Sequence, residues 1–279
     1  MPRVPHHPNH SDVSRPSENL AQFVGSPRSV AWRQGAVHLR AAGGGAEVPD
    51  LHAHFAIQLS VGIKNEIALR TSRRAAAQWA EAWLVASDQP HWMNGRGAIV
   101  TIFWDPVSTS GRRAAKRLAQ RETLALAPAE GAAMRRRLQA SWKRGWRVLD
   151  LHAAADELAI MLAPGDLSSV VYDARVQAVL DEIVLGSSEN TSLADLAARV
   201  GLSESRLSHL FRRDVGLPMR QYRLTLRMQA AVKHMIGGSS LTEAAHAAGF
   251  ADSSHFCRIC RRMSGMAPSN LPDFEIQGQ

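Results

Sequence analysis

Two histidines separated by one residue are the first side chains whose types and spacing suggest chemistry. His52 and His54 stand in the stretch His52-Ala-His-Phe-Ala-Ile-Gln58, whose apolar texture is typical of a strand. Period-two alternation then predicts that both rings point to one face of the strand. A neutral imidazole suits zinc, iron or nickel, and it can also hydrogen-bond an organic ligand or a neighbouring ring.

Two basic pairs near the C-terminal end indicate a different chemistry. Each pair follows an amphipathic stretch and precedes a glycine, in Phe211-Arg-Arg-Asp-Val-Gly216 and in Cys260-Arg-Arg-Met-Ser-Gly265. Arginine binds phosphate groups and the edges of guanine bases. A single exposed arginine is commonly a solvated surface charge, but equivalent positions in a repeat favour a shared polyanion.

An internal repeat positions these basic pairs. Leu193–Gly201 matches Leu241–Gly249, and each copy is a short amphipathic stretch with a central alanine. Ser192 and Ser240 precede the two copies with the spacing of a capping box or a close relative of it. A small residue followed by glycine lets a second helix cross closely, so each copy predicts the first helix of a helix-turn-helix unit.

The second helix of each unit is expected to start at a new cap, Ser203 or Asp252. The apolar residues that recur at helical spacing are Leu207, Leu210 and Phe211 in the first unit, and Phe256, Ile259 and Cys260 in the second. Between the units, Pro218–Ile236 forms one helical pattern that ends at Gly237-Gly238. A helix of this length spans about 28 Å, close to the roughly 34 Å between successive major-groove faces on one side of DNA.

The organisation of the whole chain predicts an α+β fold. We expect a disordered tail over 1–22, a β-rich domain over 23–110, a helical connector over 111–165 with dimerisation as a candidate role, and an all-α domain over 173–273. The expected strands are Ala36–Leu39, Phe55–Val61, Glu66–Leu69, Trp83–Val85 and Ala98–Trp104. Helix is expected from Gly111 to Leu162, broken by Pro128 and Gly131, with a linker over Ala163–Ser169.

Composition excludes several classes of protein. The 279 residues hold no apolar run long enough to cross a membrane and no secretion signal at the start, so we expect a cytoplasmic protein. The net charge of +8 lies mostly before residue 173, so charge alone does not locate a DNA-binding face. Cys257 and Cys260 are the only cysteines, and their helical spacing predicts one outward and one core residue rather than a zinc site, although a redox switch stays open.

The last hundred residues resemble the DNA-binding domain of the AraC family of transcription regulators. The clearest stretch runs from Leu241 to Ser269, with Gly-Phe, an acidic cap, Ser-x-Phe, a basic pair and a final Gly-x-x-Pro-Ser. Cys260 departs from the family, which usually places phenylalanine there, and the smaller side chain slims the core of the second unit. The resemblance implies a regulator, activator or repressor, that binds double-stranded DNA as a homodimer, responds to a small-molecule effector and can contact RNA polymerase.

By the same resemblance, two recognition helices read two successive major-groove segments. The residues implied at base edges are Ser205, Ser208, His209, Ser254, His255 and Arg258. Arg258 is the strongest candidate, because arginine bonds guanine O6 and N7 together. The remaining outward residues on these helices are Arg206, Arg212, Arg213, Arg261 and Arg262, of which the two basic pairs are expected at phosphates.

Residues 37–104 resemble, more loosely, the cupin-like sensing domain often fused to such modules. Gln58 stands where metal-binding cupins place a glutamate, and His91 follows where they place a distant histidine. The effector pocket implied by the resemblance consists of His52, His54, Gln58 and His91. A metal-free effector pocket is favoured, a purely structural role is open, and no cofactor is expected; His52, His54 and His91 are the ligands if a metal binds.

The basic segment Arg112–Arg147 carries apolar stripes and should pack as helices. Dimerisation is its favoured role, with extra phosphate contact or a solvated face as alternatives. For the whole chain we favour a regulator without enzyme activity. The alternative is a metal-dependent cupin enzyme with a helical appendage, and the missing glutamate counts against it. A scaffold protein would leave the doubled helix-turn-helix spacing unexplained.

Overall fold

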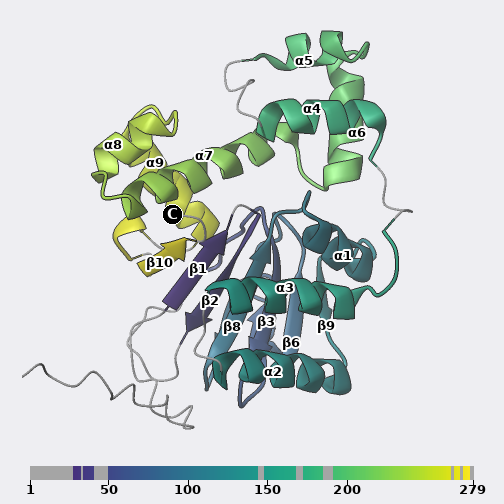
Figure 1. The fold of residues 1–279 in the computed structure, drawn as a ribbon, viewed down its shortest axis with the longest axis vertical. Coiled ribbons are helices and arrows are strands. Elements are labelled where there is room, and N and C mark those ends of the chain that lie inside the picture. The colour runs from purple at the N-terminus through teal and green to yellow at the C-terminus, as the bar shows by residue number, and fades with distance from the viewer. Residues whose placement is uncertain are drawn as a thin grey trace, which may run out of the picture.

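The structure is a computed structural model in which a β-rich half carries helices on one face and a helical half across one end (Figure 1). It describes residues 28–32, 34–40, 50–143, 148–167, 172–184, 191–264, 267–270 and 273–276. The predicted tail over 1–22 and the last residues of the predicted linker lie outside these ranges.

Two sheets form the β-rich half. The larger has seven strands, in the spatial order β10 (Asp273–Ile276), β1 (Arg28–Trp32), β2 (Gly35–Arg40), β8 (Ile99–Trp104), β3 (Ile57–Gly62), β6 (Ala82–Val85) and β9 (Thr123–Ala125). The smaller has the order β5 (Gln78–Ala80), β4 (Ile67–Arg70) and β7 (Trp92–Gly95). All neighbouring strands are antiparallel except β10 and β1. The five strands predicted from the sequence are present with boundaries shifted by one or two residues.

Strand β3 is buried on both faces, and its side chains alternate between two different environments. Leu59 and Val61 belong to the core that the sheet shares with the helices. Gln58 and Ser60 point the other way, since the amide of Gln58 bonds Ser60 Oγ and contacts the sulfur of Met93 on β7. The inner face of the barrel-like half therefore carries a polar strip in an otherwise apolar core.

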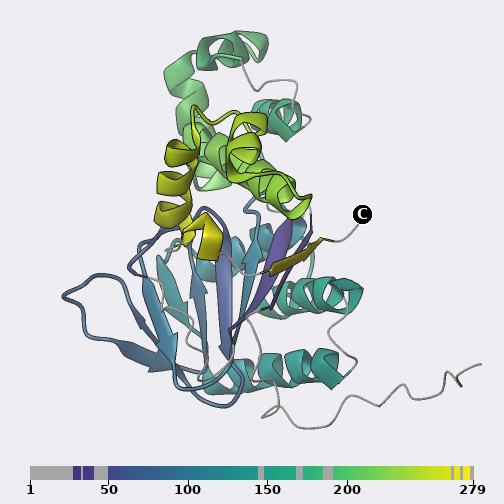
Figure 2. The same cartoon turned by 90° about the vertical axis from the view of Figure 1, so that its left-hand side faces the viewer.

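A helical layer covers one face of the large sheet (Figure 2). It consists of α1 (Thr109–Leu118), α2 (Pro128–Lys143) and α3 (Val148–Leu162). The prediction of helix from Gly111 up to the break at Pro128 was wrong at β9, which pairs with β6. Gly131 does not break the helix either: it lies inside α2, where a Cβ would come 2.8 Å from Cβ of Glu81, so glycine there allows close packing on the sheet.

The C-terminal half is built from short helices around one apolar cluster. They are α4 (Ala174–Val184), α5 (Leu193–Arg199), α6 (Glu204–Val215), α7 (Met219–Ile236), α8 (Leu241–Ala247) and α9 (Ser253–Ser264), followed by a 3-10 turn, η2 (Pro268–Asn270). Helix α7 runs as a rod between the group α4–α6 and the group α8–α9 (Figure 1). Its 18 residues confirm the predicted connecting helix, with Pro218 as its N-cap.

The two halves contact each other through residues that the sequence did not single out. Phe55, just before β3, is 1% exposed and belongs to the apolar cluster of the C-terminal helices. Tyr222 on α7 donates to Asp105 at 3.4 Å, and Gln221 donates to Asp88 at 2.9 Å. Strand β10 adds a further link, because the chain returns after the last helix to pair with β1. This strand begins where the predicted all-α domain of 173–273 ends, and the sequence pattern did not indicate it.

Candidate nucleic-acid interface and histidine cluster

Helices α5 and α6 form the first helix-turn-helix unit, and its caps are those expected. Ser192 accepts from the backbone of Asp195, and Ser203 accepts from the backbone of Arg206. The turn between them contains Gly201 with φ of 66°, the left-handed conformation that glycine adopts without steric cost. Ala197 is 2% exposed, so its small side chain sits where the two helices pack.

Helices α8 and α9 repeat this arrangement. Ser240 and Glu243 form a complete capping box, and Asp252 accepts from the backbone of His255 at the start of α9. Gly249 has φ of 74° in the turn. Cys260 is fully buried and Cys257 is half-buried, as the helical spacing predicted.

The structure brings the predicted DNA-contacting side chains to the outer faces of α6 and α9. Exposed on these helices are Ser205, Arg206, His209, Arg212, Arg213, Ser254, Arg258, Arg261 and Arg262, while Ser208 and His255 are half-buried. Leu207, Leu210 and Phe211 are buried beneath the first set, and Phe256 beneath the second. Each helix therefore turns its apolar side to the cluster and its basic side outward.

Two of the arginines already have partners within the protein. The guanidinium of Arg213 bonds Asp214 at 2.6 Å, which holds it along the helix end. Arg262 is linked through its backbone, since its carbonyl oxygen accepts from the N–H of Ala53 at 3.4 Å. The end of α9 thus touches the segment between His52 and His54.

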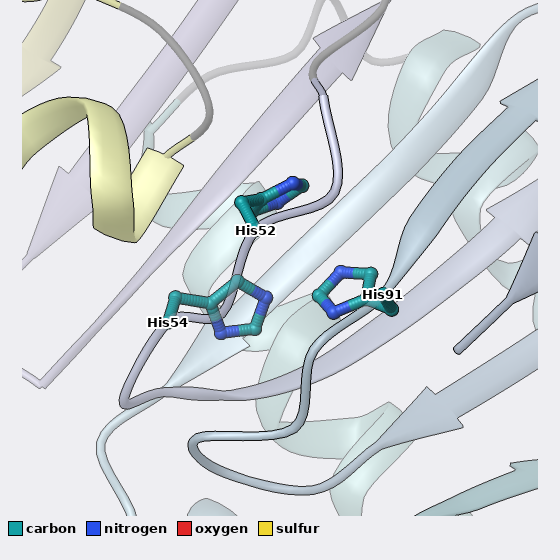
Figure 3. Close-up of side chains that lie close together, drawn as sticks. All are labelled: His52, His54 and His91. Carbon is teal, nitrogen blue, oxygen red and sulfur yellow. The ribbon is translucent and has the colours of Figure 1, made fainter. Parts of the chain in front are cut away.

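The three histidines of the predicted effector pocket come together (Figure 3). His52, His54 and His91 each offer one ring nitrogen, and these three nitrogens lie within 4.8 Å of one another. The backbones of His52 and His91 clamp the two segments together with reciprocal N–H to O bonds of 3.1 and 2.8 Å. His54 and His91 are 7% and 0% exposed, whereas His52 is half-buried and accessible from solvent.

The expected reason for this meeting was wrong even though the residues do meet. His52 takes part in an isolated bridge and His54 lies outside any strand, because β3 starts only at Ile57. The rings converge because the segment before β3 curves against the residue that precedes β7. Period-two alternation within one strand does not produce the cluster.

Hydrogen bonds orient all three rings in the same way. Each Nδ1 lies against a backbone carbonyl oxygen: Asp50 for His52 at 2.7 Å, Ala56 for His54 at 2.9 Å and Gln89 for His91 at 2.9 Å. A carbonyl accepts, so each Nδ1 carries the proton and donates. Each Nε2 is therefore left with its lone pair.

Gln58 faces two of these lone pairs. Its Oε1 lies 2.5 Å from Nε2 of His54 and 3.2 Å from Nε2 of His91. Its Nε2 donates to Ser60, whose hydroxyl continues to Thr101 at 2.9 Å. The amide is thus fixed with an acceptor toward the histidines.

Burial keeps the cluster uncharged. It lowers the pKa of His54 to about 4 and the pKa of His91 well below its usual range, and neighbouring rings lower both further. Burial also lowers the pKa of His52. At neutral pH all three imidazoles are neutral, the form that can bind a metal ion or accept a hydrogen bond.

A separate cavity lies at the far end of β7 from His91. Its volume is about 550 Å³, and its walls include Lys64, Glu66, Trp79, Glu81, Arg96 and Arg135. This lining is polar and carries both charges. The volume falls in the range of small-molecule sites, but the histidine cluster is not part of it.

Comparison with known proteins identifies the type of domain in the C-terminal half. Residues 196–272 match a family described as a helix-turn-helix domain. The transcriptional activator NphR of Rhodococcus sp is 29% identical over 139 residues, covering 47% of this chain and 41% of NphR. The arabinose operon regulatory protein of Escherichia coli K12 is 32% identical over 83 residues, 29% of this chain and 28% of that protein. The matched stretches span less than half of either relative.

The fold of most of the chain is similar to that of ToxT from Vibrio cholerae. An apo ToxT structure aligns with a TM-score of 0.53 at 11% sequence identity, covering 85% of this chain and 96% of ToxT. A second ToxT structure aligns with a TM-score of 0.50 at 12% identity. The architecture is therefore that of a cupin-like β-rich half joined to a double helix-turn-helix half. The C-terminal half is an AraC-type helix-turn-helix domain, the class of domain found in AraC-family transcription regulators.

Proposed function

We propose that this protein is a sequence-specific, effector-responsive transcription regulator that reads two successive major-groove segments of DNA with α6 and α9. The carrying observation is the paired geometry: two capped helix-turn-helix units, each with a basic outer face, joined by one 18-residue helix. The rod of α7 spans about 27 Å, so the two reading helices can reach neighbouring turns of one DNA face.

Base contacts are assigned to Ser205, Ser208, His209, Ser254, His255 and Arg258, with the remaining outward arginines at the backbone. Arg258 is exposed in the middle of α9, where a side chain can enter the groove. Arg212, Arg261 and Arg262 lie nearer the helix ends, where phosphates pass. Arg213 would have to leave Asp214 to join them, so we expect it to contribute least.

The test is binding of the full-length protein to DNA from upstream of its own coding sequence, measured by fluorescence anisotropy across salt concentrations. Selective binding that weakens with salt is expected. Arg258→Ala should cost about 1–3 kcal/mol at the cognate site and relax discrimination at one base pair. Arg261→Ala should weaken cognate and random DNA alike and reduce the salt slope.

Arg121→Ala is the matched control, because it removes the same charge from an exposed position in the β-rich half. It should leave selectivity unchanged. Equal losses of selectivity in Arg121→Ala and Arg258→Ala would contradict the assignment of α9 as a reading helix. Absence of selective binding under every effector condition would refute the proposed function.

The protein is proposed to act as a homodimer through α3. This helix packs on the sheet with one side, and the opposite side exposes Leu149 and Ile160, 63% and 49% exposed, which lie three turns apart on one face. Three arginines of the basic connector, Arg117, Arg135 and Arg137, pair with Glu130, Glu81 and Glu157, which makes these three less available for phosphate contact. Ile160→Glu should give monomers in light scattering at concentrations where the parent is dimeric, while the exposed Asp156→Ala should not.

No enzymatic activity is proposed. Such a regulator would act in the cytoplasm, where bacterial DNA lies, with RNA polymerase as a further partner. None of the helices that the structure describes is long and apolar enough to span a membrane. The cupin-enzyme alternative requires turnover of a substrate at the histidine cluster, so a metal-loaded protein that binds DNA selectively and turns over nothing would exclude it.

A further inference from the structure

The histidine cluster has an unusual mismatch of hydrogen-bonding groups. With every Nδ1 donating to a carbonyl, Nε2 of His54 and Nε2 of His91 are acceptors, and each faces the acceptor Oε1 of Gln58. Lone pairs that converge without a proton between them repel, and burial removes the water that would separate them. Such an arrangement is stable when a cation occupies the space between the atoms.

The geometry around that space is suited to a metal ion. If three ring nitrogens lie within 4.8 Å of one another, one point lies within about 2.8 Å of all three, against about 2.0–2.1 Å for a zinc–nitrogen bond. Side-chain rotations that move each ring nitrogen by less than about 1 Å would therefore bring all three to metal-bonding distance. Metal-bound histidines typically donate their other ring N–H to a backbone carbonyl or a carboxylate, and all three rings here already do so.

We propose that His52, His54 and His91, with Oε1 of Gln58, bind one divalent transition-metal ion of the zinc, nickel or iron type, and that this ion is the effector of the protein. The ion's role as effector rests on the proposed function; the site itself does not. Imidazole nitrogen and amide oxygen are ligands for these metals. The four donor groups are neutral, so the site should bind its ion more weakly and more reversibly than one containing a carboxylate.

The backbone of the histidine cluster is hydrogen-bonded to the C-terminal half that carries the two recognition helices. Ala53, between two ligands, donates to the carbonyl of Arg262 on α9. The carbonyl of His54 accepts from the N–H of Asp88, whose carboxylate accepts from Gln221 on α7. Phe55, the next residue, is buried among the C-terminal helices. Drawing the three rings onto an ion therefore displaces a segment that touches both α7 and α9.

The first experiment measures metal binding by full-length protein after chelator treatment, by titration with Zn²⁺ and with Co²⁺ as a spectroscopic probe. One ion per chain is expected, with cobalt spectra lacking the charge-transfer band of a thiolate ligand. His52→Asn, at a half-buried position, should reduce affinity at least about 10- to 100-fold. Cys257→Ser and the exposed His246→Gln are the matched controls and should retain the parental affinity.

Gln58→Glu separates the proposal from a metal-free network. A glutamate adds an anionic ligand, so metal affinity should rise and added Zn²⁺ should raise the melting temperature of this variant more than that of the parent. If instead the amide is turned by 180°, its NH₂ donates to both histidines and no ion is needed. Glutamate would then destabilise the protein with no rescue by Zn²⁺, and that result would overturn the proposal.

The second experiment compares DNA affinity with and without the metal. We expect a change of about 5- to 150-fold in the parent and none in His52→Asn, together with slower amide exchange at Ala53 in the metal-bound protein. Metal binding with unchanged DNA affinity would refute the effector role. Selective DNA binding by a protein that takes up no metal would refute the metal site and leave the proposed function standing. Metal uptake without any DNA binding would support the metal site and refute the proposed function.

Discussion

Replacing Phe55 with alanine should destabilise the C-terminal helical half, although Phe55 belongs to the β-rich half in sequence. The side chain is 1% exposed and lies in the apolar cluster of the C-terminal helices, although the residue directly precedes strand β3. Truncating a buried phenylalanine costs about 3–5 kcal/mol. The C-terminal helices should bear most of that cost, because the adjoining sheet core is formed by other residues, Leu59 and Ile102 among them.

Amide hydrogen exchange measures this distribution directly. Since about 1.4 kcal/mol corresponds to a factor of ten, exchange of the α7 and α9 amides should accelerate at least a hundredfold in Phe55→Ala, with little change in β3 and β8. Leu59→Ala, at a fully buried position of the sheet core, is the matched control and should show the opposite pattern. Loss of protection in the sheet with the C-terminal helices unaffected would refute the placement of Phe55.

Three further predictions concern pH, capping and the cysteines. Burial lowers the pKa of His38 from 6.5 to about 4, so the unfolded chain takes up a proton at higher pH than the folded protein does. The contribution of His38 to the free energy of unfolding is therefore complete above about pH 6.5. It falls by up to about 3 kcal/mol as the pH drops toward 4. Urea titrations between pH 7 and 4.5 in chelator should show this loss, with a shallower slope in His38→Gln. Ser240→Ala removes the capping box of α8 and should cost about 1 kcal/mol in thermal unfolding, whereas the exposed Thr242→Ala should cost much less. A thiol reagent should label one cysteine, Cys257, in native protein and both in urea; rapid native labelling of Cys260 would contradict its burial.

The sequence predicted best those features that are encoded within a few residues. The helix-turn-helix units depend on caps, a small residue and a glycine, all local, and the structure has Ser192, Ser203, Ser240 and Asp252 at the expected helix starts. Strand β9 was missed because its pairing with β6 is a long-range contact and its Leu-Ala-rich neighbourhood has high helix propensity. Strand β10 was missed for the same reason, since its partner β1 lies at the other end of the chain.

The candidate site was found by residue type but explained by the wrong geometry. His52, His54, Gln58 and His91 do meet, yet the segment that carries the first two is not a strand. The sequence could not show that Ala53 bonds Arg262 or that Asp88, with φ of 58°, accepts from Gln221. Such contacts depend on how two halves of the chain dock, and short-range patterns carry little information about docking.

The strengths of these contacts determine what kind of movement a ligand could cause. A net hydrogen bond contributes about 0.5–1.5 kcal/mol, so the bonds of Ala53 to Arg262, Gln221 to Asp88 and Tyr222 to Asp105 together hold only a few kcal/mol. That is comparable with the 1–3 kcal/mol by which an effector typically couples two sites. Exposing Phe55 would cost at least as much as all three, so a ligand can break the polar contacts but not withdraw the phenylalanine. A ligand at the cluster should therefore turn the C-terminal half about Phe55, carrying α6 and α9 with it, without separating the halves.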